Sequence, residues 1–400
     1  MIKTKSRTNH PMGFLFSAAE ASIKKPGRKD MALIYSKAEA NIAGVFTANK
    51  VKAAPVKLGI KRIRSGRAQA IIVNSGNANA CTGKQGMQDA IEASELVAKS
   101  LKIRPSLVYV CSTGVIGTLM PMHKIRPKIY ELAGNSGKAQ LEDVAAAIMT
   151  TDTFPKIISK RIKVGNKIGT IAGICKGAGM IAPKMATMLC FILTDIAVEK
   201  KALNKALADS VEKSFNRITI DGDMSTNDTA LIMANGMLGN TLLKEKSPAY
   251  KSFKKTLDAI TYELSKLIVK DGEGATKFIE IEVRGAANEK EAEKAGFAVA
   301  NSSLVKTAIY GNDANVGRIM AAIGYSGIEF NDEKVDIYLG KIKVISKGTS
   351  AGEDKKANKY LTDNKEIKIL INLNKGKASA KILTCDLTEE YIRVNAAYRT

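Results

Sequence analysis

Thr187 stands in a setting where a hydroxyl group could act as a nucleophile. It follows a glycine-rich turn at residues 176–179 and precedes an apolar, strand-like run at residues 188–193. A threonine hydroxyl is a poor nucleophile unless a base takes its proton, and this chain has only two histidines. Cleavage between Ala186 and Thr187 would give Thr187 a free α-amine with a pKa of about 8, which could serve as that base. By composition and spacing alone, the segment is equally typical of a turn that leads into a buried strand.

The same hydroxyl could also make the cut. Attack of the Thr187 hydroxyl on the Ala186 carbonyl would give an ester, and water would hydrolyse that ester to leave chains 1–186 and 187–400. One event would therefore create both the nucleophile and its base.

Alternating hydrophobic patterns predict strands and helices on both sides of this segment. Strands are expected at residues 31–36, 68–74, 107–112, 170–175, 278–283, 335–339, 366–373 and 377–383. Helices are expected at residues 87–101, 141–149, 201–215, 248–269 and 290–299, where apolar residues recur every three or four positions. The expected fold class is therefore a layered α/β or α+β protein.

Turn residues predict two hairpins and the length predicts two domains. Gly165 and Asn166 predict a hairpin within residues 163–167, and residues 374–376 predict a second hairpin before the final strand. A chain of 400 residues is long enough for two or three domains. We expect two α/β domains, 1–200 and 201–400, with the active site between them.

Composition excludes several classes of protein. Apolar residues make up 45% of the chain and charged residues 25%, as in ordinary globular proteins. The longest apolar stretch, 180–198, is interrupted by Lys184 and Asp195, so no membrane span is expected. The five cysteines are widely spaced and odd in number, which favours a reducing cytoplasm over a disulfide framework. Neither His10 nor His123 lies in a metal-binding spacing, so no metal is expected.

The formal net charge of +23 raises the question of a nucleic-acid partner. The basic residues are scattered as pairs with no long basic run, and the chain has no tryptophan and only 5% aromatic residues on which bases could stack. We therefore expect no nucleic-acid partner and a surface that favours anionic metabolites.

Several motifs occur in order along the chain, at residues 13–56, 74–83, 112–117, 149–153, 221–228, 271–277 and 398–400. Together with residues 176–189, they resemble the ornithine acetyltransferase (glutamate N-acetyltransferase) family of arginine biosynthesis. The resemblance covers nearly the whole chain. It implies a self-processing acyltransferase fold with an N-terminal threonine nucleophile, cut between Ala186 and Thr187.

The resemblance also implies a reaction. Thr187 would take the acetyl group from N-acetylornithine, ornithine would leave, and glutamate would then accept the acetyl group in a ping-pong cycle. This cycle needs no cofactor, although acetyl-CoA stays open as an alternative acetyl donor. The family further suggests that the processed alpha and beta chains form a heterotetramer with two copies of each.

The resemblance to this family implies functional roles for several residues that would otherwise be interpreted only as parts of turns, loops or a chain end. Thr113 and Gly114 match its oxyanion donors, and glycine lets a backbone amide come close to the reacting oxygen. Lys176 would pair with a substrate carboxylate, and Glu273 would receive the ammonium group of ornithine. The full set of predicted substrate contacts is Thr150, Lys176, Thr187, Glu273, Asn395 and Thr400.

Two details of the match leave questions open. Thr151 and Thr153 lie close to Thr150 in the sequence, so any of the three could match the family's substrate-binding threonine. The chain also departs from the family pattern at Lys184, Ala314, Val316 and Ala397, which bears on fine specificity more than on reaction class.

Two other functions compete with this interpretation. A self-processing amidohydrolase or aminopeptidase would use the same Thr187 but would release the acyl group to water. A basic nucleic-acid-binding protein would instead show salt-sensitive binding to DNA or RNA.

Overall fold

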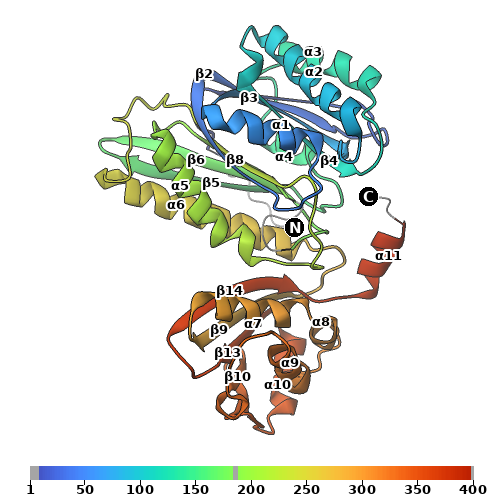
Figure 1. Cartoon of the computed structure of the whole chain (residues 1–400), viewed down its shortest axis with the longest axis vertical. Helices are drawn as coiled ribbons and strands as arrows, with labels where there is room; N and C mark the ends of the chain where they lie inside the picture. The colour runs from blue at the N-terminus through green and yellow to red at the C-terminus, as the bar shows by residue number, and fades with distance from the viewer. Residues whose placement is uncertain (1–8, 183–187, 398–400) are drawn as a thin grey trace.

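The computed structural model describes residues 9–182 and 188–397, and within these ranges the chain forms a layered α/β structure with two β-sheets (Figure 1). Each strand and helix expected from the hydrophobic pattern overlaps an observed element. The layered α/β fold class is thereby confirmed.

The first sheet has eight strands in the order β4-β3-β2-β8-β7-β6-β5, with β1 paired to β2. Its strands are β1 Phe14–Ala19, β2 Met31–Phe46, β3 Arg67–Asn77, β4 Val108–Val115, β5 Lys156–Val164, β6 Lys167–Lys176, β7 Leu189–Thr194 and β8 Thr229–Ala234. Every residue of β7 and β8 is buried. Such continuous apolar strands are stable where both faces of a sheet are covered.

Helices cover both faces of this sheet. They are α1 Ala54–Arg62, α2 Gly83–Leu101, α3 Met122–Gly134, α4 Leu141–Ala147, α5 Lys200–Glu212 and α6 Pro248–Lys270. Side chains of α5 and α6 pack with Ile192 and Ile232, whereas α4 packs with Phe191 and Leu231 on the opposite face. Neighbouring residues of one strand thus enter two different cores.

Helix α6 is the long helix that connects the two sheets. Pro248 begins it, where the missing N–H has no helical partner to lose. Its apolar stripe includes Leu257, Ile260 and Leu264, all fully buried, and each contributes roughly 1.5–3 kcal/mol of burial free energy. Phe278 of the second sheet belongs to the same core. The helix therefore lies between the two sheets, as Figure 1 shows.

The second sheet has six strands in the order β12-β11-β10-β13-β9-β14. These are β9 Phe278–Ala286, β10 Asp336–Leu339, β11 Ile342–Ser346, β12 Thr349–Ser350, β13 Glu366–Asn372 and β14 Ala378–Cys385. Its helices are α7 Glu289–Asn301, α8 Ser303–Tyr310, α9 Val316–Gly324 and α10 Asp354–Asp363, and α11 Glu389–Ala397 follows β14. Figure 1 shows α11 leaving this sheet towards the first one.

One of the two predicted hairpins is confirmed and the other is wrong. β5 and β6 pair antiparallel around Gly165 and Asn166. The turn at residues 374–376 does not join paired strands, because β9 lies between β13 and β14 and pairs with both. The turn instead crosses the end of β9, where the Lys375 and Gly376 N–H groups donate to the Gly285 carbonyl at 2.8 and 2.7 Å.

The change from the first sheet to the second comes after α6, and not at residue 200. Lys200 begins α5, and the strands before and after it, β7 and β8, are neighbours in the first sheet. The boundary predicted near residue 200 therefore does not coincide with the division between the sheets.

Among the helices that the structure describes, none is both long and apolar enough to cross a membrane.

Candidate active site

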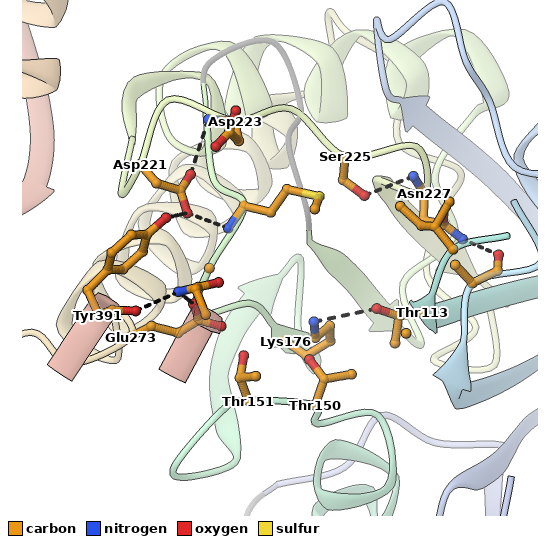
Figure 2. A pocket seen from close by; sticks show the side chains of 16 residues that line it. Thr113, Thr150, Thr151, Lys176, Asp221, Asp223, Ser225, Asn227, Glu273 and Tyr391 are labelled. Atoms are coloured by element: carbon orange, nitrogen blue, oxygen red, sulfur yellow. Dashed lines mark hydrogen bonds between the residues drawn. The ribbon is translucent and has the colours of Figure 1, made fainter. Parts of the chain in front are cut away.

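Six of the predicted site residues, from both halves of the sequence, come together in one pocket (Figure 2). Its walls come from the ends of β4 and β6, the loop after α4, the loop before β8, the end of α6 and helix α11. The lining residues are Ala78, Thr113, Gly114, Ile116, Thr150, Thr151, Lys176, Gly179, Met180, Asp221, Asp223, Ser225, Asn227, Glu273, Tyr391 and Asn395.

Gly114 occupies a position that only glycine fits. Its φ is +134°, and a Cβ atom there would lie 2.3 Å from the carbonyl carbon of Gly76 and 2.4 Å from the nitrogen of Asn77. Gly76 is its partner on the neighbouring strand β3. The absence of a side chain thus lets two strand ends approach closely beside Thr113, at the wall where the oxyanion donors are predicted.

Lys176 is the buried cation of the pocket. Its ammonium group lies 3.5 Å from the Thr113 hydroxyl and 4.0 Å from the Asp152 carboxylate. Burial lowers the pKa of Lys176, and the attraction of Asp152 opposes this effect only in part. Lys176 lines the pocket beside Thr113, within reach of a group that enters it.

Asp152 is shared between several donors beneath the pocket. It accepts hydrogen bonds from the Gly177 N–H at 2.7 Å, from the Lys156 ammonium at 2.6 Å and from the Thr150 N–H at 3.0 Å. Burial alone would raise its pKa, but the charges of Lys176 and Lys156 and these hydrogen bonds lower the pKa of Asp152 to about 2. The carboxylate is therefore charged at neutral pH, and it fixes the loop that carries Thr150.

A second carboxylate completes this buried network. Lys156, which is fully buried, also donates to Asp271, and Asp271 accepts the Thr153 N–H at 3.0 Å and the Thr153 hydroxyl. Burial opposes the charge on Lys156, but Asp152 and Asp271 together raise its pKa. The two carboxylates compensate the buried charge of Lys156, and the network joins Thr153 to Asp271 beneath the pocket.

Glu273 lies on a different wall from Lys176 (Figure 2). Its carboxylate accepts a hydrogen bond from the Asn395 amide at 2.8 Å. It also packs over Gly179, where a Cβ atom would lie 2.3–2.5 Å from the carboxylate oxygens. One pocket therefore presents an anion on one wall and a cation on another.

Asp221 and Tyr391 hold the loop that carries Met180. The Asp221 carboxylate accepts the N–H groups of Met180 at 2.6 Å and Ile181 at 2.9 Å, and the Tyr391 hydroxyl donates to it at 3.3 Å. Burial raises the pKa of Asp221, and the nearby acidic groups together with burial raise the pKa of Tyr391. Helix α11 is thereby joined to the glycine-rich turn.

The loop before β8 fixes the wall opposite Glu273. The Asn227 amide donates to the carbonyls of Ala78 at 2.6 Å and Ser112 at 2.8 Å, next to Thr113. The Asp228 carboxylate accepts the Met188 N–H at 2.6 Å, and burial raises the pKa of Asp228 well above its usual range. Through the adjacent residues Asn227 and Asp228, these bonds connect Met188, which directly precedes β7, to the end of β4.

Six of the predicted site residues line this pocket: Thr113, Gly114, Thr150, Lys176, Glu273 and Asn395. Ala186, Thr187 and Thr400 lie outside the described residues. The roles of all these residues stay predictions.

Thr150 and Thr151 have different surroundings from Thr153. Thr150 and Thr151 line the pocket, whereas Thr153 hydrogen-bonds to Asp271 in the network beneath it. A substrate contact is therefore open to the first two and not to Thr153.

Within residues 9–182 and 188–397, no group of three histidine, cysteine or acidic side chains is arranged to hold a metal ion.

Comparison with known proteins identifies the family. The model of the ArgJ family matches residues 15–400. The chain belongs to the ArgJ family. The family resemblance seen in the sequence motifs is thereby confirmed.

Curated ArgJ relatives match this chain along nearly their full length. The arginine biosynthesis bifunctional protein ArgJ of Geobacter sulfurreducens is 51% identical, covering 97% of this chain and 99% of the relative. The protein of the same name from Caldanaerobacter subterraneus is 49% identical over 98% of each chain.

A solved ArgJ structure also matches. The crystal structure of arginine biosynthesis bifunctional protein ArgJ from Bacillus halodurans has a TM-score of 0.51 and 45% sequence identity. The match covers 52% of this chain and 98% of the solved chain.

The departures from the ArgJ pattern lie mostly away from the pocket. Ala314 and Val316 precede and begin α9 in the second sheet's part of the fold, and neither lines the pocket. Ala397 ends α11, and Lys184 lies outside the described residues.

Sequence reasoning missed several residues that shape the site. Asp152, Lys156, Asp271, Asp221, Asn227 and Tyr391 received no role. Four of them stand inside the quoted motifs at residues 149–153, 221–228 and 271–277, so the motifs contained the signal. Lys156 and Tyr391 stand outside these motifs and carried none.

Proposed function

We propose that this ArgJ-family chain is an acyltransferase of arginine biosynthesis that moves an acetyl group from N-acetylornithine to glutamate through an acetyl-Thr187 intermediate. The observation that carries the proposal is the pocket with Lys176 and Glu273 on different walls and the Thr113–Gly114 strand end beside Lys176. An amino acid substrate with opposite charges fits such an arrangement.

The first half of the cycle transfers the acetyl group to the enzyme. The Thr187 hydroxyl attacks the acetyl carbonyl carbon, and its own α-amine takes the proton. Donors at Thr113 and Gly114 stabilise the negative charge that develops on the carbonyl oxygen. The C–N bond then breaks, the departing amine receives the proton, and ornithine leaves an acetyl ester on Thr187.

The second half reverses these steps with another amine. The α-amine of glutamate attacks the ester carbonyl, the same oxyanion donors act again, and the ester C–O bond breaks. The proton returns to the Thr187 oxygen, and N-acetylglutamate leaves. No bound cofactor is required for either half.

Substrate charges are matched by the two walls of the pocket. Lys176 pairs with the α-carboxylate, because its side-chain nitrogen lines the pocket beside the Thr113 hydroxyl. Glu273, oriented by Asn395, receives the side-chain ammonium of ornithine. Thr150 or Thr151 and the terminal Thr400 complete the set of contacts.

We further propose that the chain processes itself between Ala186 and Thr187. The Bacillus halodurans match supports this, because nearly the whole solved chain aligns with only about half of this one. A separate product of residues 187–400 would align in the same way. Two copies of each product would form the working heterotetramer in the cytoplasm.

A second acetyl donor is supported by the names of the relatives. The curated proteins are called bifunctional. We therefore propose that acetyl-CoA also acetylates Thr187, with the thiol of coenzyme A leaving in place of ornithine.

Intact mass spectrometry of the purified protein tests the processing step. We expect two species that break between Ala186 and Thr187, and a single uncut, inactive chain for Thr187→Ala. The matched control is Thr362→Ala, an exposed threonine on α10, which should be cut and active like the wild type. Full activity in a wild-type chain that remains uncut would disprove the proposal.

An acceptor test distinguishes the transferase from a hydrolase. Incubation with N-acetylornithine should release ornithine continuously only when glutamate is present. Acetate release at the same rate without glutamate would instead identify the self-processing amidohydrolase.

A further inference from the structure

Asn227 is a buried asparagine of the pocket wall to which the proposed acetyl transfer assigns no role. It precedes β8, is 5% exposed, and lies on the same side of the pocket as Thr113 (Figure 2). Its amide group donates two hydrogen bonds, to the Ala78 carbonyl at 2.6 Å and to the Ser112 carbonyl at 2.8 Å. Ser112 belongs to β4 and Ala78 directly follows β3, so one side chain joins two neighbouring strand ends.

The orientation of the Asn227 amide is fixed by its own neighbours. Its side-chain oxygen accepts the Thr226 hydroxyl at 2.6 Å, and its backbone N–H donates to the Ser225 hydroxyl at 3.1 Å. The Thr229 hydroxyl donates to the Asn227 carbonyl at 3.0 Å. Because two carbonyl oxygens face the outer end of the side chain, the amide N–H groups and not the amide oxygen point towards them. The side chain therefore cannot rotate without losing buried hydrogen bonds.

The bonds of Asn227 hold both ends of the segment that carries the predicted oxyanion donors. Residues 113–114 lie between Ser112, whose carbonyl bonds to Asn227, and Val115. The Val115 carbonyl accepts the Ala78 N–H at 2.9 Å, and Ala78 is itself bonded to Asn227. A displacement of Asn227 would therefore be passed to the backbone of residues 113–114 from both sides.

The residue after Asn227 holds the neighbour of the predicted nucleophile. The Asp228 carboxylate accepts the Met188 N–H at 2.6 Å, and the Thr229 N–H donates to the Met188 carbonyl at 3.0 Å. Met188 directly follows Thr187 in the sequence. Consecutive residues of one loop thus fix both the residue bonded to the predicted nucleophile and the segment of the predicted oxyanion donors.

The spacing between a nucleophile and its oxyanion donors limits the rate of acyl transfer. The donors must lie about 2.7–3.1 Å from the position that the charged oxygen takes in the transition state. A misplacement of about 1 Å costs roughly 100-fold in rate. Asparagine suits the task of holding them, because it supplies two donors and an acceptor without a charge that would disturb the charged substrates.

We propose that Asn227 is a positioning residue for acetyl transfer, which holds Thr113 and Gly114 at the correct distance from the residue that follows the nucleophile. This rests on the proposed acetyl transfer through Thr187. Asn227 forms no bond to the substrate and moves no proton. Its effect is on kcat, because the oxyanion donors act in the transition state, and not on the charge contacts that bind the substrates.

Steady-state kinetics of Asn227→Ala test the proposal. We expect kcat for ornithine release from N-acetylornithine, with glutamate as acceptor, to fall roughly 100-fold, while both KM values stay within about twofold of wild type. The rate is expressed per molecule of cut enzyme, determined by intact mass spectrometry. Asn227→Ser, which keeps one shorter donor, should show a smaller decrease in kcat and provides the same measurement if the alanine variant does not fold.

Asn235→Ala is the matched control. Asn235 is a buried asparagine at the other end of β8, and its amide donates to the Met12 carbonyl at 2.9 Å and to the Ser36 hydroxyl at 3.3 Å. It does not line the pocket. Its substitution also removes two buried hydrogen bonds, so it should lower the Tm by a similar amount but leave kcat within about twofold of wild type.

A double variant shows whether Asn227 acts through the oxyanion donors. Gly114→Ala moves the same backbone, so Asn227→Ala should add little to it. The kcat of the double variant should therefore lie within roughly tenfold of that of Gly114→Ala. Independent effects would instead multiply to a loss of at least roughly 10,000-fold.

Four results would overturn the inference. A cut, folded Asn227→Ala enzyme with wild-type kcat would show that these hydrogen bonds do not matter for the reaction. A higher KM with unchanged kcat would show that Asn227 contacts the substrate itself. An equal decrease of kcat in Asn235→Ala would indicate a general effect of lost buried hydrogen bonds, and multiplied losses in the double variant would indicate an action apart from the donors. A wild-type enzyme that transfers no acetyl groups would instead refute the proposed function, on which the inference rests.

Discussion

Replacement of Gly114 by alanine should damage catalysis far more than stability. The new Cβ atom would overlap the Gly76 carbonyl carbon at 2.3 Å and the Asn77 nitrogen at 2.4 Å, and a φ of +134° is itself unfavourable for alanine. Backbone strain of this kind costs roughly 1–3 kcal/mol. The two strand ends must therefore separate, and the backbone beside Thr113 moves with them.

The expected decrease in kcat follows from the proposed role of Thr113 and Gly114 as oxyanion donors. Removal of one oxyanion donor typically costs about 3–4 kcal/mol of transition-state stabilisation, or roughly 100- to 1,000-fold in kcat. We expect kcat for acetyl transfer from N-acetylornithine to fall by that factor in Gly114→Ala. The KM should change little, because the charge contacts at Lys176 and Glu273 stay in place.

Two glycine controls make the measurement specific. Gly117 has a φ of +82° but no atom within 4 Å of an added Cβ, so Gly117→Ala tests backbone strain without the clash. Gly134 has neither a positive φ nor a close neighbour, so Gly134→Ala tests the extra methyl group alone. Steady-state kinetics, thermal unfolding and intact mass should be recorded for all three variants. Wild-type kcat in a folded, processed Gly114→Ala enzyme would refute the oxyanion role.

Three further predictions follow from the charged groups of the site. In Glu273→Gln, loss of the negative charge should raise the KM for N-acetylornithine at least about tenfold with a smaller effect on glutamate, and unchanged steady-state KM values would contradict the assigned contact. In Lys176→Gln, the KM values of both substrates should rise, and a variant with normal KM values would show that Lys176 does not bind their carboxylates. The lowered pKa of Asp152 means that its stabilising effect is full above its unfolded pKa of 3.8 and is lost as pH falls through about 2. Between pH 4 and pH 2 the free energy of unfolding, measured by denaturant titration, should therefore fall by about 2 kcal/mol less in Asp152→Asn than in the wild type. The exposed control Asp363→Asn should show the same fall as the wild type.

Hydrophobic periodicity was sufficient to predict the elements with long or alternating apolar runs. The α6 pattern and the β5–β6 turn are examples, because burial on one face and a two-residue turn are local properties. The predicted hairpin at residues 374–376 failed because pairing of β9 between β13 and β14 is a long-range choice. No local turn signal reports which strand will be inserted between two others.

Only part of the site was predicted from the sequence, because some of its contacts are also long-range. Motifs identified Thr113, Lys176 and Glu273, whose chemistry is visible in a short segment. Lys156 stands in a strand pattern typical of a solvated lysine, and only the fold brings Asp152 and Asp271 to it. Lys156 and Asp271 are 115 residues apart in the sequence, so no local pattern could predict that contact.

Helix α11 has a consequence for how the integrity of the pocket can be judged. It follows β14 of the second sheet and brings Tyr391 and Asn395 to the pocket lining. A chain cut before residue 389 would keep every strand of both sheets but would lack these two side chains. A folded core is therefore not by itself evidence that the pocket is complete.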